Sequence, residues 1–412
     1  MRFGSRAMFV VAVGWTAMVL GSGCATMREH ASNLDLRPCT DGYALTDDGW
    51  KLGIRHYRPA RPDPSKHPVV LCHGLGLNGT FWTITDNHLP KQLTERGYDV
   101  YIVDLRGSGA SRRTGPVGHM NSLIRQTFLL EIGAHRWTMD DQALHDVPAI
   151  LDYVQNETGD DRINWVGHSL GGMLLFPYLE LTPENHRIAT FVAMGSPAIL
   201  AEAPERKMLG ANRQLRVLLA AISTGRAARM LMFGRPSGLE SIDRLYYSAE
   251  NVDRRTVDRF YGYTLEDPGR GALDQLAHYL EKGHLLSADQ KTDYVARLGE
   301  IREPTLFIAG DGDVMASRVS CEKTYEAIGS PDKAIISFGK AGGYSHDYGH
   351  CDLVWSRNAP REVFPAIADW LDARQATRPS PQSPPSMPSE QRIDANLRPG
   401  LKAVPSGQHL GH

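Results

Sequence analysis

Short runs of consecutive apolar residues alternate with segments of helical periodicity along much of the chain. The apolar runs lie at 67–71, 99–103, 163–166, 188–194, 304–309 and 333–338. Apolar residues at helical spacing occupy 89–96, which Gly97 closes, and 142–158, which Gly159 closes. Strands that are apolar on both faces and alternate with helices are typical of a mostly parallel sheet with helices on both sides. The pattern therefore predicts an α/β fold.

A hairpin, a last helix and an irregular insertion complete the predicted organisation. Residues 43–45 and 50–57 flank Asp47-Asp48-Gly49, a pattern typical of an antiparallel hairpin. The last helix is predicted at 361–373. Residues 113–140 lack a clear period and are expected to form a small irregular insertion.

The alternation of strands and helices stops after Pro197. Residues 198–300 are largely helical by pattern, contain Arg-rich stretches and show no convincing strand. The strand pattern resumes at 304–309. We therefore expect one core, formed by 40–197 and 301–375, that a helical cap at 198–300 interrupts.

The first 24 residues have the pattern of an export signal. Arg2 and Arg6 precede an apolar run at 7–20, which is too short for a confident membrane span, and Gly21-Ser22-Gly23-Cys24 follows. This resembles a bacterial lipoprotein signal, which would leave Cys24 as the lipidated first residue. An ordinary secretion signal and an uncleaved anchor are the alternatives. All three predict export, either as a membrane-anchored lipoprotein of the bacterial cell envelope or as a periplasmic or secreted protein.

The composition predicts a large buried core and excludes some classes of partner. Of 412 residues, 42% are hydrophobic, and the formal net charge is −2 with a pI of about 6.8. Because there is no basic bias, we expect no nucleic-acid partner. No C-x-x-C pair or His/Cys cluster suggests a metal site, and no cofactor is expected. Residues 376–412 are rich in Pro, Ser, Gln and charge and are predicted to be a disordered tail.

Four cysteines follow Cys24 in the chain. They are Cys39, Cys72, Cys321 and Cys351. In an oxidising compartment a disulfide among them is possible, but the sequence does not give its pairing. Cys72 belongs to a predicted buried strand, so we expect it to be a small core residue.

The segment that follows the run 163–166 carries the candidate nucleophile. Gly167-His168-Ser169-Leu170-Gly171 spells G-x-S-x-G, and an apolar helical pattern follows at 173–181. Strand, sharp turn and helix form the context in which this motif exposes a reactive serine. The turn strains the serine backbone and leaves room only for the smallest neighbours, which explains Gly167 and Gly171. Ser169 is therefore the predicted nucleophile.

A serine hydroxyl needs a base to remove its proton and an acid to orient that base, and in this architecture the acid and then the histidine follow the serine. The run 304–309 precedes Gly310, Asp311 and Asp313. We favour Asp313 because the acid usually comes three residues after such a glycine. Asp311 is the alternative acid, and a turn residue that caps the next helix is the alternative interpretation of Asp313.

Two histidines follow the run 333–338 and could serve as the base. They are His346 and His350, and the choice of His350 depends mainly on the family resemblance described below. His168 is adjacent to the nucleophile, but successive residues at a tight turn point in opposite directions. We therefore expect His168 to pack against the sheet rather than act as the base.

Two backbone N–H groups are predicted to bind the oxyanion. One belongs to Leu170, the residue after the nucleophile. The other is expected from the loop after the run 67–71, where His73-Gly74-Leu75-Gly76 lies, and we assign it to Leu75. Gly74 and Gly76 would let the backbone approach closely. A simple turn is the alternative interpretation of this loop.

These motifs together resemble the α/β-hydrolase superfamily of serine esterases and lipases, and within it the gastric and lysosomal acid lipases. The stretches that carry the resemblance are Asp48-Gly49 through His73-Gly74-Leu75, then 137–141 through 146–149 to Gly167-His168-Ser169, and 350–355 with Ala359-Pro360. The resemblance implies Ser169 as nucleophile, Asp313 as acid and His350 as base. The chain departs from the acid-lipase pattern at Leu170 and Gly172, where the family usually has Gln and Thr.

The expected reaction is hydrolysis of a hydrophobic carboxylic ester through an acyl-enzyme. Another acyl hydrolase of this fold, such as a thioesterase or an amidase, is the alternative, and a non-catalytic scaffold is the third. Ser169 argues against dehalogenases, epoxide hydrolases and polyester synthases, which use Asp or Cys as nucleophile. The apolar segment 215–233, interrupted by Arg226 and Arg229, would either pack the cap onto the core or contact acyl chains or lipid.

Overall fold

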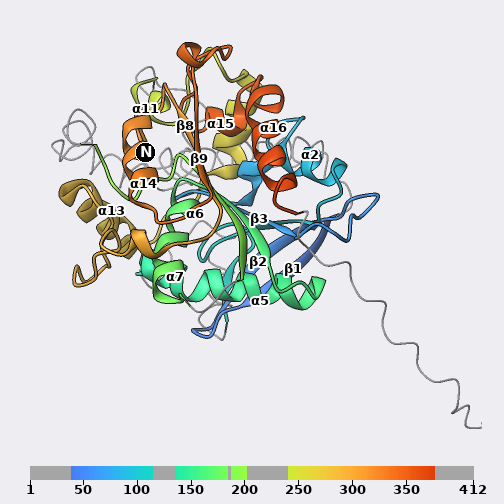
Figure 1. Cartoon of the computed structure of the whole chain (residues 1–412), viewed down its shortest axis with the longest axis vertical. Coiled ribbons are helices and arrows are strands. Elements are labelled where there is room, and N and C mark those ends of the chain that lie inside the picture. Colours follow the sequence, from blue (N-terminus) through green and yellow to red (C-terminus); the bar gives the residue numbers. More distant parts are fainter. Residues whose placement is uncertain (1–38, 115–135, 184–186, 202–239, 376–412) are drawn as a thin grey trace, which may run out of the picture. The chain divides into compact units, whose positions relative to one another are not determined.

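A computed structural model describes residues 39–114, 136–183, 187–201 and 240–375 (Figure 1). The predicted signal segment with Cys24, the segment 215–233 and the predicted tail at 376–412 lie outside these residues. None of the helices in the described ranges combines the length and the apolar character that a membrane crossing would need.

One sheet organises the described residues. Its strands are β1 (Cys39–Leu45), β2 (Trp50–Tyr57), β3 (Val69–Cys72), β4 (Val100–Val103), β5 (Arg112–Arg113), β6 (Ile163–His168), β7 (Ile188–Met194), β8 (Thr305–Gly310) and β9 (Lys333–Phe338). The order across the sheet is β1-β2-β4-β3-β6-β7-β8-β9, and the short β5 pairs with β2. The strands β1 and β2 pair antiparallel, as do β2 and β4, whereas every neighbouring pair from β4 to β9 is parallel. The predicted hairpin and the mostly parallel sheet are both confirmed.

Helices cover both faces of this sheet. They are η1 (Gly79–Trp82), α2 (Leu89–Glu95), α4 (Met139–Asp141), η2 (Gln142–Asp146), α5 (Val147–Thr158), α6 (Leu170–Met173), α7 (Leu175–Leu181), α11 (Glu240–Tyr246), α12 (Arg254–Arg259), η4 (Phe260–Thr264), α13 (Arg270–Lys282), η5 (Leu298–Glu300), α14 (Arg318–Ala327), η6 (Lys340–Gly342), α15 (Asp352–Trp355) and α16 (Ala359–Asp372). Figure 1 shows α5 and α7 on one side of the sheet and α2 and α16 on the other.

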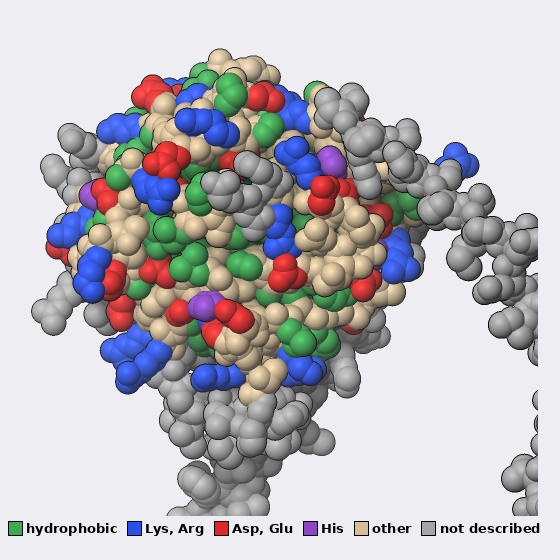
Figure 2. Space-filling view, turned by 60° about the horizontal axis from the view of Figure 1, so that its bottom comes forward, with side chains coloured by type: hydrophobic (Ala, Val, Ile, Leu, Met, Phe, Trp, Pro, Cys, Tyr) green, Lys and Arg blue, Asp and Glu red, His purple; other side chains and the backbone are tan. Residues whose placement is uncertain are grey.

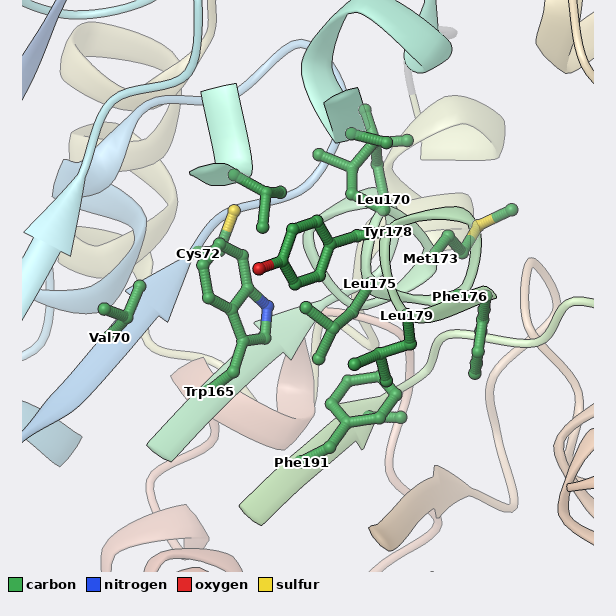
Figure 3. Packing of buried hydrophobic residues seen from close by; sticks show 14 of the residues in the cluster. Val70, Cys72, Trp165, Leu170, Met173, Leu175, Phe176, Tyr178, Leu179 and Phe191 are labelled. Carbon is green, nitrogen blue, oxygen red and sulfur yellow. The ribbon is translucent and has the colours of Figure 1, made fainter. Parts of the chain in front are cut away.

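Alternate residues of each strand feed two hydrophobic cores. On β3, Val70 and Cys72 join the core beneath α5 and α7, whereas Val69 and Leu71 join the core beneath α2 and α16. Figure 3 shows the first core, where Trp165 of β6 lies beside Tyr178 and Leu175 of α7. Burial on both faces explains why these strands are continuous apolar runs in the sequence.

Most predicted elements differ from the observed ones only at their ends. The helix predicted at 142–158 divides into the π-helical turn η2 and the helix α5. It ends where predicted, because Gly159 adopts the left-handed conformation (φ 68°) and its N–H reaches the carbonyl of Gln155. The strand predicted as buried at 333–338 is only partly buried, because β9 is the edge strand of the sheet.

The strands β7 and β8 are parallel neighbours in the sheet. A long stretch of chain connects the end of β7 at Met194 to the start of β8 at Thr305. The described part of this connection, at 198–201 and 240–300, carries α11, α12, η4, α13 and η5. It packs on both cores, with Ala272 and Tyr279 of α13 in one and Val257 of α12 with Phe260 in the other. We call residues 198–300 the β7–β8 insertion.

Three cysteines in the described part of the chain are buried. They are Cys72, Cys321 and Cys351, none of which forms a disulfide, and Cys72 is a core residue as expected. At the surface, Figure 2 shows a face on which side chains of Lys and Arg are interspersed with those of Asp and Glu, with small groups of hydrophobic side chains between them.

Candidate active site

Ser169 occupies the sharp turn between β6 and α6. Its backbone has φ 54° and ψ −123°, a conformation that non-glycine residues rarely adopt and that costs on the order of 1–3 kcal/mol. Three backbone hydrogen bonds hold the turn. The N–H of Ser169 donates to the carbonyl of Met194 at 2.8 Å, and its carbonyl accepts from Gly172 and Met173 at 3.0 Å each. The residue is only partly buried.

The two glycines of the motif are required by close backbone contacts. A Cβ atom on Gly167 would lie 2.3 Å from the carbonyl oxygen of Gly171, and one on Gly171 would lie 2.4 Å from that of Cys72. The indole N–H of Trp165 also donates to the carbonyl of Gly171 at 2.9 Å. The turn can therefore form only with glycine at both positions.

Asp313 and His350 form a buried pair. His350 Nδ1 lies 2.7 Å from Asp313 Oδ2, and the two side chains are 4% and 0% exposed. The other carboxylate oxygen, Oδ1, accepts the backbone N–H groups of Met315 and Ala316 at 2.8 Å each. Because a carboxylate only accepts, Nδ1 of His350 carries the proton and Nε2 keeps its lone pair. Asp313 thus both caps the turn after β8 and orients an imidazole.

The two alternative residues have other partners. Asp311 Oδ1 accepts the hydroxyl of Ser337 and lies 3.7 Å from the guanidinium of Arg318. The ring nitrogens of His346 bond the hydroxyls of Ser345, at 3.0 Å, and of Ser356, at 2.8 Å. Neither residue belongs to the pair formed by Asp313 and His350.

The turn of Ser169 and the loop of His350 are in direct contact. His168 Nε2 lies 2.9 Å from the backbone carbonyl of His350, and the two rings are 4.6 Å apart. On the other side, a Cβ atom on Gly195 would lie 3.2 Å from the His350 ring and 3.3 Å from Asp313 Oδ2. Gly195 follows Met194, which binds the N–H of Ser169. These contacts put the imidazole of His350 beside the nucleophile turn.

His168 is a neutral structural histidine. It is fully buried against Phe81, with ring centroids 4.5 Å apart. Burial, aided by the neighbouring His350, holds the pKa of His168 well below its usual range. The neutral ring therefore donates Nε2–H to the carbonyl of His350. This geometry agrees with the expectation that His168 packs rather than acts as a base. The hydrogen bond from its ring to the backbone carbonyl of His350 was not predicted.

Leu75 and Leu170 line the same small pocket, together with Leu105, Trp137 and Pro268. Within the described residues we find no hydrogen bond from the N–H of Leu75 or of Leu170, so both donors are available to a ligand.

The loop that carries Leu75 is held against the nucleophile turn. A Cβ atom on Gly74 would lie 3.1 Å from Cβ of Ser169. His73 Nδ1–H donates to the carbonyl of Gly74 at 2.8 Å, and His73 Nε2 accepts the N–H of Leu105 at 3.2 Å. Burial lowers the pKa of His73, so the ring stays neutral. A neutral ring can donate through Nδ1 and accept through Nε2 at the same time. We call residues 73–78 the oxyanion loop.

Two residues near this pocket were not found by sequence analysis. Asn78 and Glu266 bond to each other at 2.8 Å although 188 residues separate them in the chain. Neither belongs to a motif or to a periodic apolar pattern, so only their proximity in space identifies them.

One cluster in the described residues has the composition of a metal site. It comprises Asp47, Asp48 and His145, whose ligand atoms lie within 4.8 Å of one another. Asp48 is already paired with the guanidinium of Arg106 at 2.8 Å, and His145 Nδ1 bonds Asp47 at 2.6 Å. These contacts hold the β1–β2 turn against Arg106 and His145.

Comparison with known proteins adds a family to this geometry. A family model described as the α/β hydrolase fold matches residues 67–349. The chain is 24% identical to gastric triacylglycerol lipase of Rattus norvegicus, over 79% of this chain and 87% of the relative. It is 30% identical to lipase member N of Homo sapiens, over 81% of this chain and 86% of the relative. Its fold is similar to that of a thermophilic esterase from Thermogutta terrifontis (TM-score 0.53, 18% identity, 82% of this chain and 99% of the other).

Proposed function

Since the chain belongs to the α/β hydrolase family, and within it to the acid lipase group, we propose that it cleaves esters through Ser169, His350 and Asp313 by way of an acyl-enzyme. The family membership makes the chain a carboxylic ester hydrolase. The roles of the individual residues are the proposal. The observation that carries it is the buried pair of His350 and Asp313, 2.7 Å apart, beside the strained turn of Ser169.

In the first step Ser169 Oγ attacks the acyl carbon of the ester, and His350 Nε2 takes the hydroxyl proton. Asp313 stays ionised, holds Nδ1–H and stabilises the imidazolium that forms. The carbonyl oxygen of the ester gains a negative charge and accepts the N–H groups of Leu75 and Leu170. The tetrahedral intermediate then collapses, His350 gives its proton to the leaving alkoxide, and an alcohol departs.

The second step uses the same groups with water as the nucleophile. His350 Nε2 removes a proton from a water molecule, which attacks the acyl carbon of the ester on Ser169. The oxyanion again binds Leu75 and Leu170. When the intermediate collapses, Ser169 Oγ takes the proton back and the carboxylic acid is released. The reaction is complete without a metal ion or an organic cofactor.

The substrate is proposed to be an ester with an apolar acyl group. Leu75, Leu105 and Trp137 contribute apolar surface to the pocket, beside the polar Gln142 and Glu266, and Pro268 of the β7–β8 insertion borders it. This supports a cap role for the insertion, in which its residues limit the length of the acyl chain. The relatives named as triacylglycerol lipases point to the same class of substrate.

The N-terminal pattern supports an exported, membrane-anchored enzyme. Cleavage before Cys24 and its lipidation would hold the hydrolase at a membrane, where lipophilic esters dissolve. Metabolic labelling with a radioactive fatty acid would mark the wild-type protein and leave Cys24→Ser unlabelled. An unlabelled wild type would contradict the anchor.

A fluorophosphonate probe tests the nucleophile directly. We expect it to label the wild type and not Ser169→Ala, and we expect Ser169→Ala to lose about 10⁴-fold or more in kcat on p-nitrophenyl butyrate. We would compare kcat/KM for p-nitrophenyl esters from acetate to palmitate. The acyl length with the highest value reports the length of acyl chain that the pocket accepts. An acyl thioester and an anilide of the same acyl group test the thioesterase and amidase alternatives.

The base is tested with the two competing histidines. His350→Ala is expected to be as inactive as Ser169→Ala, and His346→Ala to keep most of the activity. Equal labelling of wild type and Ser169→Ala, or a dead His346→Ala beside an active His350→Ala, would refute the assignment.

A further inference from the structure

A segment of the β7–β8 insertion is paired with the oxyanion loop. We call residues 264–269 the cap strap. The N–H of Asn78 donates to the carbonyl of Thr264 at 3.1 Å, and the N–H of Glu266 donates to the carbonyl of Gly76 at 2.8 Å. Leu77 and Leu265 form an antiparallel bridge between these two bonds. The strap thus holds the oxyanion loop by its backbone, immediately after Leu75.

The side chain of Glu266 adds a second link. Glu266 Oε1 accepts Nδ2–H of Asn78 at 2.8 Å and the backbone N–H of Gly109 at 3.1 Å. The other Nδ2 proton of Asn78 goes to the carbonyl of Tyr263 at 2.8 Å. One carboxylate oxygen therefore joins three segments that are distant in the chain: the strap, the oxyanion loop and the loop after β4.

The far end of the strap is fixed against Trp137. A Cβ atom on Gly269 would lie 2.4 Å from Nε1 of Trp137, and the N–H of Ala272 donates to the carbonyl of Trp137 at 2.8 Å. Between its two fixed ends, the strap contributes Glu266 and Pro268 to the pocket that Leu75 and Leu170 also line. The strap is therefore part of the wall of the pocket, and it is anchored on both sides.

We propose that Glu266 is a positioning residue for ester hydrolysis, which holds the oxyanion loop so that the N–H of Leu75 meets the developing oxyanion. This inference rests on the proposed function. Although Glu266 borders the pocket, this role needs no contact between its carboxylate and the substrate. It acts through Asn78 and the loop backbone, and it makes the oxyanion hole depend on the position of the β7–β8 insertion.

The reason for a catalytic effect is geometric. A backbone donor stabilises the transition state only within hydrogen-bonding distance of the oxyanion, and loss of one such donor lowers the rate by about 10²–10³. A loop that loses one of its hydrogen bonds to the strap still carries the N–H of Leu75, but the position of that N–H becomes less fixed. Loss of the Glu266 carboxylate should therefore lower kcat by part of that factor and leave ester binding in the ground state nearly unchanged.

The test compares Glu266→Ala, Glu266→Gln and the control Glu300→Ala. Glu300 is an exposed glutamate of the same insertion, and its partner is Arg297 at the surface. Gln keeps an oxygen at the position of Oε1, which can still accept from Asn78 and Gly109. The measurements are kcat and KM on p-nitrophenyl butyrate, normalised to active sites titrated with the fluorophosphonate, so that misfolded protein is not counted.

Two inhibitors separate the oxyanion hole from the pocket. A butyl trifluoromethyl ketone adds to the nucleophile and forms an oxyanion, whereas the matching secondary alcohol fills the pocket without one. For Glu266→Ala we expect kcat to fall about 10- to 100-fold, KM to stay within about 3-fold, and the ketone to weaken by the same factor as kcat. The alcohol should bind as before, Glu266→Gln should recover most of the loss, and Glu300→Ala should match wild type.

The outcomes distinguish this inference from the proposed function. If Glu266→Ala keeps kcat and ketone affinity while Ser169→Ala is dead, the positioning role is wrong and the nucleophile stands. If the alcohol and the ketone weaken equally, Glu266 only shapes the pocket, and the positioning role is again overturned. If Ser169→Ala is as active as wild type, the proposed function fails and this inference falls with it.

Discussion

Ser169 and Asp313 illustrate how single residues build this site. The strained backbone of Ser169 persists because its N–H and carbonyl are bound by β7 and α6. The neighbouring loop leaves little room beside it, since a Cβ atom on Gly74 would lie 3.1 Å from Cβ of Ser169. One carboxylate oxygen of Asp313 accepts backbone N–H groups of the turn after β8, and the other bonds and orients the ring of His350. A residue with both roles gives a variant that can lose activity and keep the fold.

Asp313→Asn should therefore separate chemistry from stability. The amide oxygen of Asn can still cap Met315 and Ala316, while its NH₂ group faces His350 Nδ1. The imidazole must then turn its lone pair toward the amide, which leaves Nε2 protonated and unable to accept the proton of Ser169. We expect kcat to fall about 10³- to 10⁴-fold with little change in the thermal midpoint. Steady-state kinetics and calorimetry on one preparation measure both.

Asp311→Asn is the matched control for this prediction. Asp311 lies two residues away and bonds Ser337 rather than a histidine. Its substitution should change kcat by less than about 3-fold. An Asp311→Asn enzyme as impaired as Asp313→Asn would mean that charge near β8, and not the tautomer of His350, limits the rate.

The candidate site could be predicted from the sequence where a residue type has a fixed place in a motif. Ser169 is fixed by the glycines around it. The choice between Asp311 and Asp313 depends on one position in a turn, and the structure shows which carboxylate meets the imidazole. Asn78 and Glu266 could not be predicted, because their contact depends on how the insertion folds back and no local pattern encodes it.

At the scale of the elements, the turn between β6 and α6 is a close junction of backbone segments. Gly171 packs against the end of β3, where a Cβ atom would lie 2.4 Å and 2.6 Å from the carbonyl oxygens of Cys72 and His73. Both neighbours are backbone atoms and cannot rotate away. Any side chain at this position must separate α6 from β3.

Gly171→Ala is expected to destabilise the protein by about 3 kcal/mol or more, because overpacking against backbone cannot relax locally. Urea denaturation followed by tryptophan fluorescence measures the free energy of unfolding. Gly299→Ala is the control, since its nearest heavy atom, the carbonyl oxygen of Ala327, would lie 4.0 Å from the new Cβ. A Gly171→Ala protein as stable as Gly299→Ala would show that the turn has more freedom than these contacts allow.

Elements whose buried side chains are apolar were predicted well from the sequence, and elements whose buried side chains are polar were not. Strands buried on both sides were found because their side chains are uniformly apolar. The helix α14 lacks such a stripe, because its buried residues are Ser320, Cys321 and Thr324. Two of these hydroxyls accept backbone N–H groups of the β7–β8 insertion, at 2.9 Å and 3.0 Å. A helix that binds its neighbour through hydroxyl groups cannot be bounded by hydrophobic periodicity.

At the scale of the whole molecule, the insertion contributes apolar residues to both cores, so its attachment and the stability of the fold are linked. One buried carboxylic acid lies at this junction. Glu180, on α7, is 2% exposed, and neither carboxylate oxygen has a hydrogen-bond partner among the described residues. Burial, with Asp293 and Glu300 of the insertion, raises the pKa of Glu180 to about 8, although Arg297 opposes the shift.

The sign of this shift gives a prediction for stability against pH. Because the folded pKa exceeds the ordinary value of 4.5, the folded state binds the proton of Glu180 more tightly than the unfolded state does. Its contribution is complete below pH 4.5 and is lost as pH rises to about 8. Glu180→Gln removes this titration. The unfolding free energy of the variant should exceed that of wild type by little at pH 5 and by on the order of 3 kcal/mol at pH 9.

Urea denaturation at unit steps from pH 5 to pH 9 measures that difference, and groups that titrate in both proteins cancel from it. Glu95→Gln, which removes the same charge from an exposed position on α2, should run parallel to wild type. A difference between Glu180→Gln and wild type that is constant across the range would mean that Glu180 is ionised in the folded state at all these pH values. In that case Arg297 would have to approach the carboxylate more closely than its bond to Glu300 allows, and the junction between α7 and the insertion would be an ion pair rather than a buried neutral acid.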